Sequence, residues 1–465
     1  MSNDIKKAYF IGIGGVSMSG LAEILRSKGW IVSGSDVKSS EITESLKLLG
    51  VTVYKGHSAS NITPDIDLVV NTSAVKPDNP EMEAAGLLGI KIVDRARLLG
   101  EIMREFDCPI CVAGTHGKTS TTSMVADILL AANMNPTVSV GGYLASIGGY
   151  FKLGGKEYFV VESCEYCDNF LKFYPKIGVI LNIDADHLDY FSSLEQIKQS
   201  FREFAKKIPA DGALVVFEGV DKEVYEGLEC KVITYGMEKG SVKGDDYDGH
   251  AADHFFADGV EYDTDGHPAF TIYHNGERLG DVTPKIHGEH NVLNALAATA
   301  ASMAAGANFE SVAAGLNSFD GAKRRFEDKG IFNGARVIDD YAHHPTEIVA
   351  TLTAASKSKH KKIYCVFQPH TYTRTKALAS EFANSFGSAD VVLVMDIYAA
   401  REKDTGLIHS RDLADRINST GTSAIYCDSV ELARNFLIEH CGAGDLLITV
   451  GAGDVYLLGE SLVRE

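Results

Sequence analysis

Residues 110–131 read ICVAGTHGKTSTTSMVADILLA, and they give the clearest signal of the fold in the middle of the chain. The apolar run 110–113 predicts a buried strand, and residues 120–131 predict a helix. A glycine-rich turn between a strand and a helix directs backbone N–H groups toward phosphate oxygens. We therefore predict an ATP-binding loop, made of Gly114, Thr115, His116, Gly117, Lys118, Thr119 and Ser120.

Two side chains of this loop have specific expected roles. Lys118 is expected to reach the β- and γ-phosphates, and the Thr119 hydroxyl is expected to ligate Mg²⁺. The common form of the motif, G-x-x-x-x-G-K-[ST], needs glycine at position 112, where the chain has Val112. The loop is therefore a variant that is shorter than the common one.

Short apolar runs alternate with helical patterns on both sides of the loop, which is typical of parallel sheets flanked by helices. We predict an α/β protein with a Rossmann-like domain at 1–105, a central P-loop-type ATPase domain at 106–321 and a second Rossmann-like domain at 322–465. Each domain is expected to contain a mostly parallel sheet. Within the central domain we interpret 238–285 as irregular β structure, because it is rich in Gly and Asp.

The overall charge argues against two classes of function. The chain has 44 basic and 63 acidic residues, which gives a formal net charge of −19. Proteins that wrap nucleic acid or lie on an anionic membrane need a basic surface, so we predict neither. We find no signal peptide and no apolar run long enough to span a membrane, and we expect a cytoplasmic protein that is a monomer or weak homodimer.

The cysteines form two pairs with C-x-x-C spacing. Cys108 and Cys111 are one pair, and Cys164 and Cys167 are the other. Such pairs can hold a structural zinc ion, but the gap between these two is far longer than in common zinc modules. We therefore expect reduced thiols.

A second glycine cluster lies near the N-terminus. Gly12-Ile-Gly14-Gly15-Val-Ser-Met-Ser-Gly20 follows a predicted strand and starts a predicted helix, and Asp36 ends the next strand. This resembles a dinucleotide fingerprint, but the third glycine of that motif is replaced by Ser17. The cluster indicates binding of a nucleotide or pyrophosphate, without indicating NAD. A tight turn that binds no ligand is the alternative.

Further polar residues follow predicted strands of the central domain. Glu162 and His187 end two strands that we expect to be neighbours, so both side chains should lie near Lys118 at the carboxyl edge of the sheet. Together with Thr119 they are candidate Mg²⁺ ligands, although Mg²⁺ prefers oxygen donors. Residues 287–294 start a helix of small residues. We expect this polar cluster either to contact adenine or ribose or only to cap the helix.

The third domain carries a basic cluster and two polar strand ends. Arg325, in the cluster 323–326, either binds phosphate or belongs to a solvated charge run. Residues 339–345 and 367–374 follow two strands where α/β sheets place their functional loops. In these loops we expect Arg374 to bind a carboxylate, and His343 to orient an amine or accept a proton from it.

In this order, these motifs resemble the Mur ligase family, and the resemblance covers nearly the whole chain. The short loop at 114–119, the segment Gly-Ile-Gly-Gly at 12–15, Asp-Asp-Tyr-Ala-His-His-Pro at 339–345 and Phe-Gln-Pro-His-Thr-Tyr-Thr-Arg at 367–374 carry it. The resemblance implies three domains, which bind a UDP-sugar, ATP and an amino acid in turn.

The resemblance also implies roles for individual residues. The implied UDP-sugar ligands are Gly12, Gly14, Gly15, Ser19, Asp36, His57 and Ser73. The implied nucleotide contacts outside the loop are His290, Asn291, Asn294 and Arg325. The implied amino-acid ligands are Tyr341, His343 and Arg374. Lys118, His343 and Arg374 are the implied catalytic residues, and Thr119, Glu162 and His187 the implied Mg²⁺ ligands.

The implied activity is an ATP-dependent ligation in peptidoglycan precursor synthesis. L-alanine is joined to the lactyl carboxylate of UDP-N-acetylmuramate through an acyl phosphate, which gives ADP and phosphate. Three departures stand out: the segment 162–168 differs from the family pattern around Glu165 and Asp168, Thr371 replaces an arginine of some members, and Arg202 stands near the position of a carbamylated lysine in other relatives.

Three other functions stay open at this point. One is a recycling ligase that attaches a preformed tripeptide to UDP-N-acetylmuramate. The second is a nicotinamide-dependent oxidoreductase that uses the cluster 12–20, and it leaves the loop at 114–119 unexplained. The third is a nucleotide-binding switch without catalysis.

Overall fold

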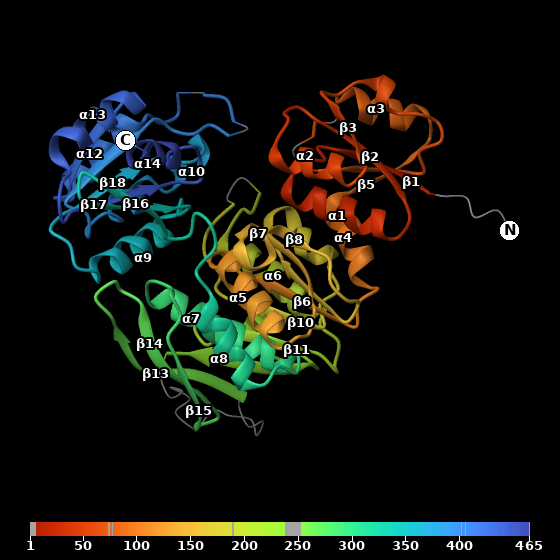
Figure 1. Cartoon of the computed structure of the whole chain (residues 1–465), viewed down its shortest axis with the longest axis horizontal. Helices are drawn as coiled ribbons and strands as arrows, with labels where there is room; N and C mark the ends of the chain where they lie inside the picture. Colours follow the sequence, from red (N-terminus) through yellow and green to blue (C-terminus); the bar gives the residue numbers. More distant parts are fainter. Residues whose placement is uncertain are drawn as a thin grey trace.

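The computed structural model describes residues 6–72, 75–76, 78–187, 190–237, 253–400, 402–404 and 406–464. It contains three separate sheets, so the predicted three-domain α/β fold is confirmed. The N-terminal and C-terminal units lie on either side of the central unit, and both adjoin it (Figure 1). The boundaries expected near 105 and 321 fall between the sheets and stay predictions.

The N-terminal sheet has five parallel strands in the order β3-β2-β1-β4-β5, which is the Rossmann order without its sixth strand. Its strands are β1 (Lys7–Ile11), β2 (Ile31–Asp36), β3 (Thr52–Lys55), β4 (Leu68–Asn71) and β5 (Lys91–Asp94). Its helices are α1 (Val16–Ser27), α2 (Glu41–Leu48), α3 (Pro80–Leu87) and α4 (Arg95–Met103), with the short helix η1 (Ala59–Asn61).

The central sheet has ten strands in the order β15-β14-β13-β12-β11-β10-β6-β9-β7-β8. The strands are β6 (Cys108–Ala113), β7 (Thr137–Leu144), β8 (Gly149–Lys152), β9 (Tyr158–Glu162), β10 (Ile177–Ile180), β11 (Ala213–Phe217), β12 (Lys231–Gly236), β13 (Asp253–Tyr262), β14 (Pro268–His274) and β15 (Glu277–Val282). The helices are α5 (Lys118–Ala131), α6 (Leu194–Ala205), α7 (Glu289–Ala304) and α8 (Phe309–Ser318), with η2 (Ala145–Ile147), η3 (Tyr166–Lys172) and η4 (Lys222–Val224).

Helices cover both faces of the central sheet, which is why its strands are almost continuously apolar. Val112 of β6 belongs to the same buried cluster as Met124 of α5 and Leu296 of α7. The neighbouring Cys111 faces the other way and belongs to a cluster with Phe201 of α6. Strand β6 therefore lies at the centre of a two-sided core, and its carboxyl end carries the ATP-binding loop.

Two expectations about the central domain are wrong. The part of 238–285 that the structure describes is regular: β13, β14 and β15 are antiparallel strands that extend the sheet, with β13 parallel to β12. Strands β9 and β10 are not neighbours, because β6 lies between them. Glu162 and His187 therefore approach the loop from opposite sides of its own strand.

The C-terminal sheet has six strands in the order β16-β17-β21-β18-β19-β20, with only β16 antiparallel. The strands are β16 (Glu327–Phe332), β17 (Ala335–Asp340), β18 (Ile363–Phe367), β19 (Val391–Met395), β20 (Ser423–Cys427) and β21 (Leu446–Val450). The helices are α9 (Pro345–Ser356), α10 (Tyr372–Ala377), α11 (Ala379–Ala383), α12 (Ser410–Ser419), α13 (Val430–His440) and α14 (Tyr456–Val463).

Two general properties complete the description. All eight cysteines are free thiols. None of the helices in the described part of the chain combines the length and the apolar character that crossing a membrane requires.

Candidate functional site

The phosphate-binding loop joins β6 to α5, as predicted, but the helix begins at Lys118, two residues before the predicted start. Gly117 caps the helix in a left-handed conformation with φ of +83°. A Cβ atom at this position would lie 2.5 Å from the Asn294 side-chain oxygen. Glycine therefore lets the loop pack against α7, and Lys118 and Thr119 fall in the first turn of α5, where backbone N–H groups are free to bind an anion.

Lys118 points back across the loop. Its Nζ donates to the carbonyl of Thr115 at 3.0 Å and forms an ion pair with Glu165 at 3.0 Å. The Glu165 side chain is only 2% exposed. Burial lowers the pKa of Lys118, but the charge of Glu165 more than offsets this and raises it, so the ammonium form is retained. Sequence reasoning left the role of Glu165 open, and the structure makes it the counter-ion of Lys118.

The structure brings two of the predicted Mg²⁺ ligands, Thr119 and Glu162, into contact. Thr119 donates from Oγ1 to Glu162 Oε2 at 2.9 Å, and the Gly141 N–H donates to the same carboxylate oxygen. His187 instead lies 3.9 Å from Glu165. Thr119 and Glu162 provide adjacent oxygen donors of the kind that Mg²⁺ prefers, so these two side chains fit the ion.

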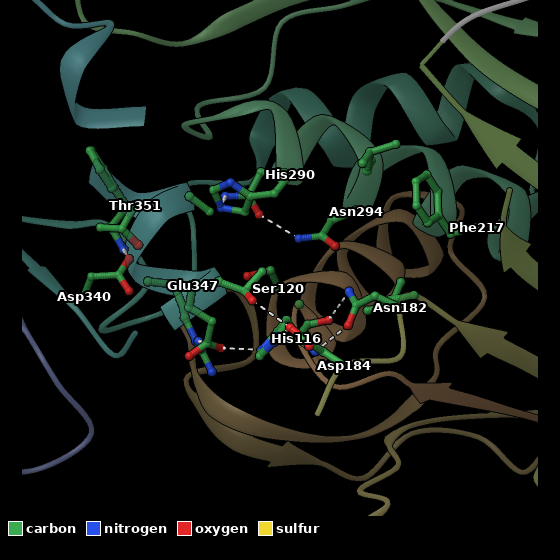
Figure 2. A pocket seen from close by; sticks show the side chains of 18 of the residues that line it. His116, Ser120, Asn182, Asp184, Phe217, His290, Asn294, Asp340, Glu347 and Thr351 are labelled. Carbon is green, nitrogen blue, oxygen red and sulfur yellow. Dashed lines mark hydrogen bonds and ion pairs between the residues drawn. The ribbon is translucent and has the colours of Figure 1, made fainter. Parts of the chain in front are cut away.

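A cavity of about 300 Å³ lies beside the loop (Figure 2). Of the predicted nucleotide contacts, it is lined by His116, Gly117, Ser120, His290, Asn291, Asn294 and Arg325. One end of the cavity is apolar, with Leu181, Phe217 and Tyr235. A cavity with an apolar end and a few polar groups suits a planar base attached to a polar sugar. Sequence reasoning missed several lining residues: Asn182, Asp184, Asp340, Thr346 and Glu347.

The C-terminal domain holds three consecutive residues of the central domain, at 184–186. Thr346 donates from Oγ1 to Asp184 at 2.6 Å. The His344 Nε2 lies 3.3 Å from the carbonyl oxygen of Ala185, and Arg374 donates from Nη2 to Asp186 at 2.8 Å. The next residue, His187, contacts Glu165. The segment 184–187 therefore connects the domain interface to the counter-ion of Lys118.

His116, Asp184 and His344 lie close enough together to suggest a metal site, but their hydrogen bonds argue against one. The Nδ1 of His344 accepts the Thr346 N–H and caps α9, while its Nε2 faces the Ala185 carbonyl. Both ring nitrogens of His344 are therefore already used.

His116 bridges the two domains with a positive charge. Its Nε2 lies 3.3 Å from Asp184, and its Nδ1 lies 3.2 Å from Glu347 of α9 (Figure 2). Burial lowers the pKa of His116, but hydrogen bonds to Asp184 and Glu347 more than offset this and raise it to about 9. The hydrogen bond from His116 also holds the pKa of Asp184 below its usual range. Burial raises the pKa of Glu347, but His343 and His116 more than offset this and lower it. At neutral pH the loop therefore carries an imidazolium paired with two carboxylates.

This pairing predicts a pH-dependent domain contact. The pKa of His116 is about 9 when folded and 6.5 ordinarily, so its stabilisation is complete below pH 6.5 and is lost as pH rises toward 9. The effect is at most about 3 kcal/mol. The other charged or titratable groups around His116 are His290, His344 and Arg325. Burial lowers the pKa of both histidines, so they stay neutral over this range.

We expect the unaltered protein to lose thermal stability between pH 6.5 and 9 relative to the His116→Gln variant. The measurement is the midpoint of thermal unfolding of both proteins across this range. Parallel pH profiles for the two proteins would contradict the assignment.

A second cavity, of about 630 Å³, is lined by residues 185–187 of the segment 184–187. The predicted amino-acid ligands Tyr341, His343 and Arg374 all line it, together with Asp186 and His187. Arg374 binds Asp186 through Nε and Nη2, so its guanidinium is held in one orientation. The cavity is thus lined by a fixed cation, Arg374, and by His187, which contacts the counter-ion of Lys118.

His343 is a neutral imidazole in this cavity. Burial lowers its pKa to about 4. Its Nδ1 lies 3.0 Å from the Tyr341 carbonyl oxygen, which can only accept, so Nδ1 carries the proton. The lone pair is then on Nε2, which makes His343 a proton acceptor at neutral pH.

The glycine cluster of the N-terminal domain forms the expected turn between β1 and α1. Gly12 has φ of +82°, and the Gly14 N–H donates to Asp36 at 2.9 Å. Asp36 therefore holds the turn itself. Ser19 is buried and donates to the Val16 carbonyl. Ser73, also a predicted UDP-sugar ligand, lies outside the described residues.

His57 is held by a buried carboxylate that sequence reasoning missed. Its Nδ1 lies 2.9 Å from Glu81, which is completely buried. Glu81 also accepts hydrogen bonds from Tyr9, Ser35 and Asn61. This carboxylate therefore connects β1, β2 and the loop after β3 behind the glycine cluster.

We expect Glu81→Ala to destabilise the N-terminal domain by about 3 kcal/mol, because several buried donors lose their acceptor. Denaturant unfolding, followed by the fluorescence of Trp30 in this domain, measures the effect. Glu83→Ala, on the same helix, is the matched control. Equal stabilities of the two variants would show that the buried network contributes little.

The three sheets, the short phosphate-binding loop and the two cavities at its edge define a three-domain α/β protein with a nucleotide site. Family models match most of the chain: "Mur ligase family, catalytic domain" at residues 7–107, "Mur ligase middle domain" at 112–302 and "Mur ligase, glutamate ligase domain" at 324–453. The chain belongs to the Mur ligase family.

Individual relatives are similar over their full length. The chain is 47% identical to a UDP-N-acetylmuramate–L-alanine ligase of Acetivibrio thermocellus, covering 100% of this chain and 97% of the relative. It is 50% identical to the ligase of the same name from Agathobacter rectalis, covering 98% and 97%.

Solved structures give the same fold. The UDP-N-acetylmuramate-alanine ligase of Thermotoga maritima matches with a TM-score of 0.80 and 29% identity, covering 98% of both chains. A murein peptide ligase of Psychrobacter arcticus matches with a TM-score of 0.70 and 26% identity, covering 99% of this chain and 98% of that one.

Proposed function

We propose that the chain is an ATP-dependent ligase that joins L-alanine to the lactyl carboxylate of UDP-N-acetylmuramate, in peptidoglycan precursor synthesis. One observation carries the proposal: consecutive residues of the segment 184–187 line the nucleotide cavity and the cavity around Arg374, and His187 contacts Glu165, the counter-ion of Lys118. An activated carboxylate formed at the loop is then next to the amino acid that attacks it. The similarity to relatives named for this reaction supports the same substrates.

The first proposed step is phosphoryl transfer. A lactyl carboxylate oxygen attacks the γ-phosphorus of ATP, the bond to the β-phosphate oxygen breaks, and ADP leaves. Lys118 keeps its charge in the buried loop, so it can neutralise negative charge on the transferring group. Thr119 and Glu162 would hold Mg²⁺, which supplies further positive charge to the phosphates when bound.

The second proposed step is attack of the alanine nitrogen on the acyl carbon. A tetrahedral intermediate forms, phosphate leaves, and the nitrogen loses a proton. Arg374 would bind the alanine carboxylate, and His343, with its lone pair on Nε2, would accept the proton. The domain contacts at 184–186 would keep water away from the acyl phosphate.

The finer proposals follow from the substrates. ATP and a sugar nucleotide are metabolites of the cytoplasm, and we propose that the enzyme acts there. A monomer or weak homodimer stays a prediction.

Phosphate release from ATP tests the proposed function. We expect release only when UDP-N-acetylmuramate and L-alanine are both present, with ADP as the second product. Candidate amino acids, and the tripeptide of the recycling reaction, are added one at a time in place of L-alanine. AMP and pyrophosphate as products, or faster turnover with the tripeptide than with L-alanine, would overturn the proposal.

A further inference from the structure

Arg95 lies where the N-terminal domain meets the central domain. It is the first residue of α4 and follows β5 directly, at the carboxyl edge of the N-terminal sheet. Its Nη1 donates to the hydroxyl of Ser17, within the glycine cluster 12–20, at 2.9 Å. Ligands of open α/β sheets bind at this edge. The guanidinium therefore borders the nucleotide turn of the first domain.

The position of Arg95 is fixed by close packing between the domains. Helix α4 contacts η3 of the central domain, and a Cβ atom at Gly100 would lie 1.9 Å from the carbonyl oxygen of Lys172. The Lys172 ammonium forms an ion pair with Asp94 at 3.0 Å. Helix α4 is thus held against the segment that follows Glu162.

The charge of Arg95 is only weakly compensated. In the part of the chain that the structure describes, its guanidinium forms one hydrogen bond, to Ser17, and no ion pair. A guanidinium has five N–H donors, so most of them are unused. Burial lowers the pKa of Arg95, and the nearby Cys164, Asp94 and Glu162 oppose this shift. Glu162, which accepts the hydroxyl of Thr119 in the ATP-binding loop, is thus one of the charges near the guanidinium.

Two other half-buried arginines of this protein have carboxylate partners. Arg324 pairs with Asp339 at 3.0 Å, and Arg374 pairs with Asp186 at 2.8 Å. Buried charges are normally paired, because an isolated charge loses its hydration. An arginine without such a partner, between two nucleotide loops, therefore suits an anionic ligand, and its planar N–H groups match phosphate and carboxylate oxygens.

We propose that Arg95 is a substrate-binding residue that holds an anionic group of the sugar nucleotide between the glycine cluster and the ATP-binding loop. This inference rests on the proposed function. The sugar nucleotide has two such groups, the diphosphate and the lactyl carboxylate. Either one, bound to Arg95, would be positioned by the same rigid helix.

The test compares Arg95→Gln, Arg95→Lys and the control Arg97→Gln. Arg97 lies on the same helix, is exposed and pairs with Glu101. We expect Arg95→Gln to raise the KM for UDP-N-acetylmuramate by about 10- to 50-fold, as for loss of a hydrogen bond to a charged group. Arg95→Lys should show a smaller increase, because it keeps the charge. The KM for ATP should stay unchanged in all three variants, which also shows that the central domain is folded.

Direct binding of two sugar nucleotides separates the two anionic groups. UDP-N-acetylglucosamine has the diphosphate but no lactyl carboxylate. Weaker binding of both nucleotides to Arg95→Gln assigns Arg95 to the diphosphate, and weaker binding of UDP-N-acetylmuramate alone assigns it to the carboxylate. Unchanged binding of both nucleotides, or an equal loss in Arg97→Gln, would overturn the inference. Failure of the unaltered protein to bind UDP-N-acetylmuramate would instead overturn the proposed function.

Discussion

Replacing Lys118 with alanine is expected to lower the rate of ligation at saturating substrates by about 10³-fold, the scale seen when a preorganised charge or donor is removed from a transition state. Glu165 keeps the Lys118 ammonium charged inside the loop, and alanine removes this charge from the phosphates. The measurement is kcat from coupled ADP release. Full turnover by Lys118→Ala would contradict the role of this residue in phosphoryl transfer.

A stability control separates lost chemistry from lost structure. Lys118→Ala leaves the buried Glu165 carboxylate without its partner, and breaking such a pair destabilises by about 3 to 5 kcal/mol. In the double variant Lys118→Met with Glu165→Gln, both charges are removed together. We expect the double variant to regain most of the thermal stability without regaining turnover.

Replacing Arg374 with lysine is expected to lower kcat/KM for L-alanine by about 10²-fold, mainly through KM. Lysine keeps the charge but cannot copy the guanidinium, which binds Asp186 through two nitrogens and so points in one direction. The measurement is a set of KM values for L-alanine, ATP and UDP-N-acetylmuramate.

Lys376→Ala is the matched control for Arg374, because Lys376 lies on the same helix and is exposed. It should leave all three KM values unchanged. An increase in the KM for ATP with no change for L-alanine in Arg374→Lys would show that Arg374 serves domain closure only.

Most of the fold was predictable because its signals are local. Strands β11, β19 and β21 show such a signal, since each is a short run of apolar residues in a parallel sheet that is buried on both faces. The start of α5 was predicted too late, because the cap is a left-handed glycine rather than Ser or Thr. The strands at 253–282 were judged irregular, because their Gly and Asp residues weaken the alternating pattern.

The candidate site was predictable where its residues stand in motifs. His116, Asn294 and Arg325 come from three distant segments, and all line one cavity. The pairing of Glu347 with His116 was not predictable, because Glu347 at the start of a helix looks like an ordinary capping residue. Thr346 and Asp184 are 162 residues apart, and nothing in the local sequence of either indicates the other.

The contacts of Glu162 and Glu165 were likewise not predictable from the local sequence. Glu162 ends β9 and Glu165 follows it, and the sequence alone favoured Glu162 as the partner of His187. The order of strands in the sheet decides otherwise, because β6 separates β9 from β10 and Glu165 reaches past the loop to both Lys118 and His187. Sheet order depends on packing of the whole domain, which no local pattern contains.

Isotope transfer from the sugar nucleotide to phosphate tests whether an acyl phosphate forms. UDP-N-acetylmuramate labelled with oxygen-18 in its lactyl carboxylate is ligated to L-alanine with unlabelled ATP, and the released phosphate is analysed by mass spectrometry. Attack of the carboxylate on the γ-phosphorus predicts one labelled oxygen in the phosphate and none in ADP. Phosphate without label, or label in AMP, would contradict activation of the carboxylate as an acyl phosphate.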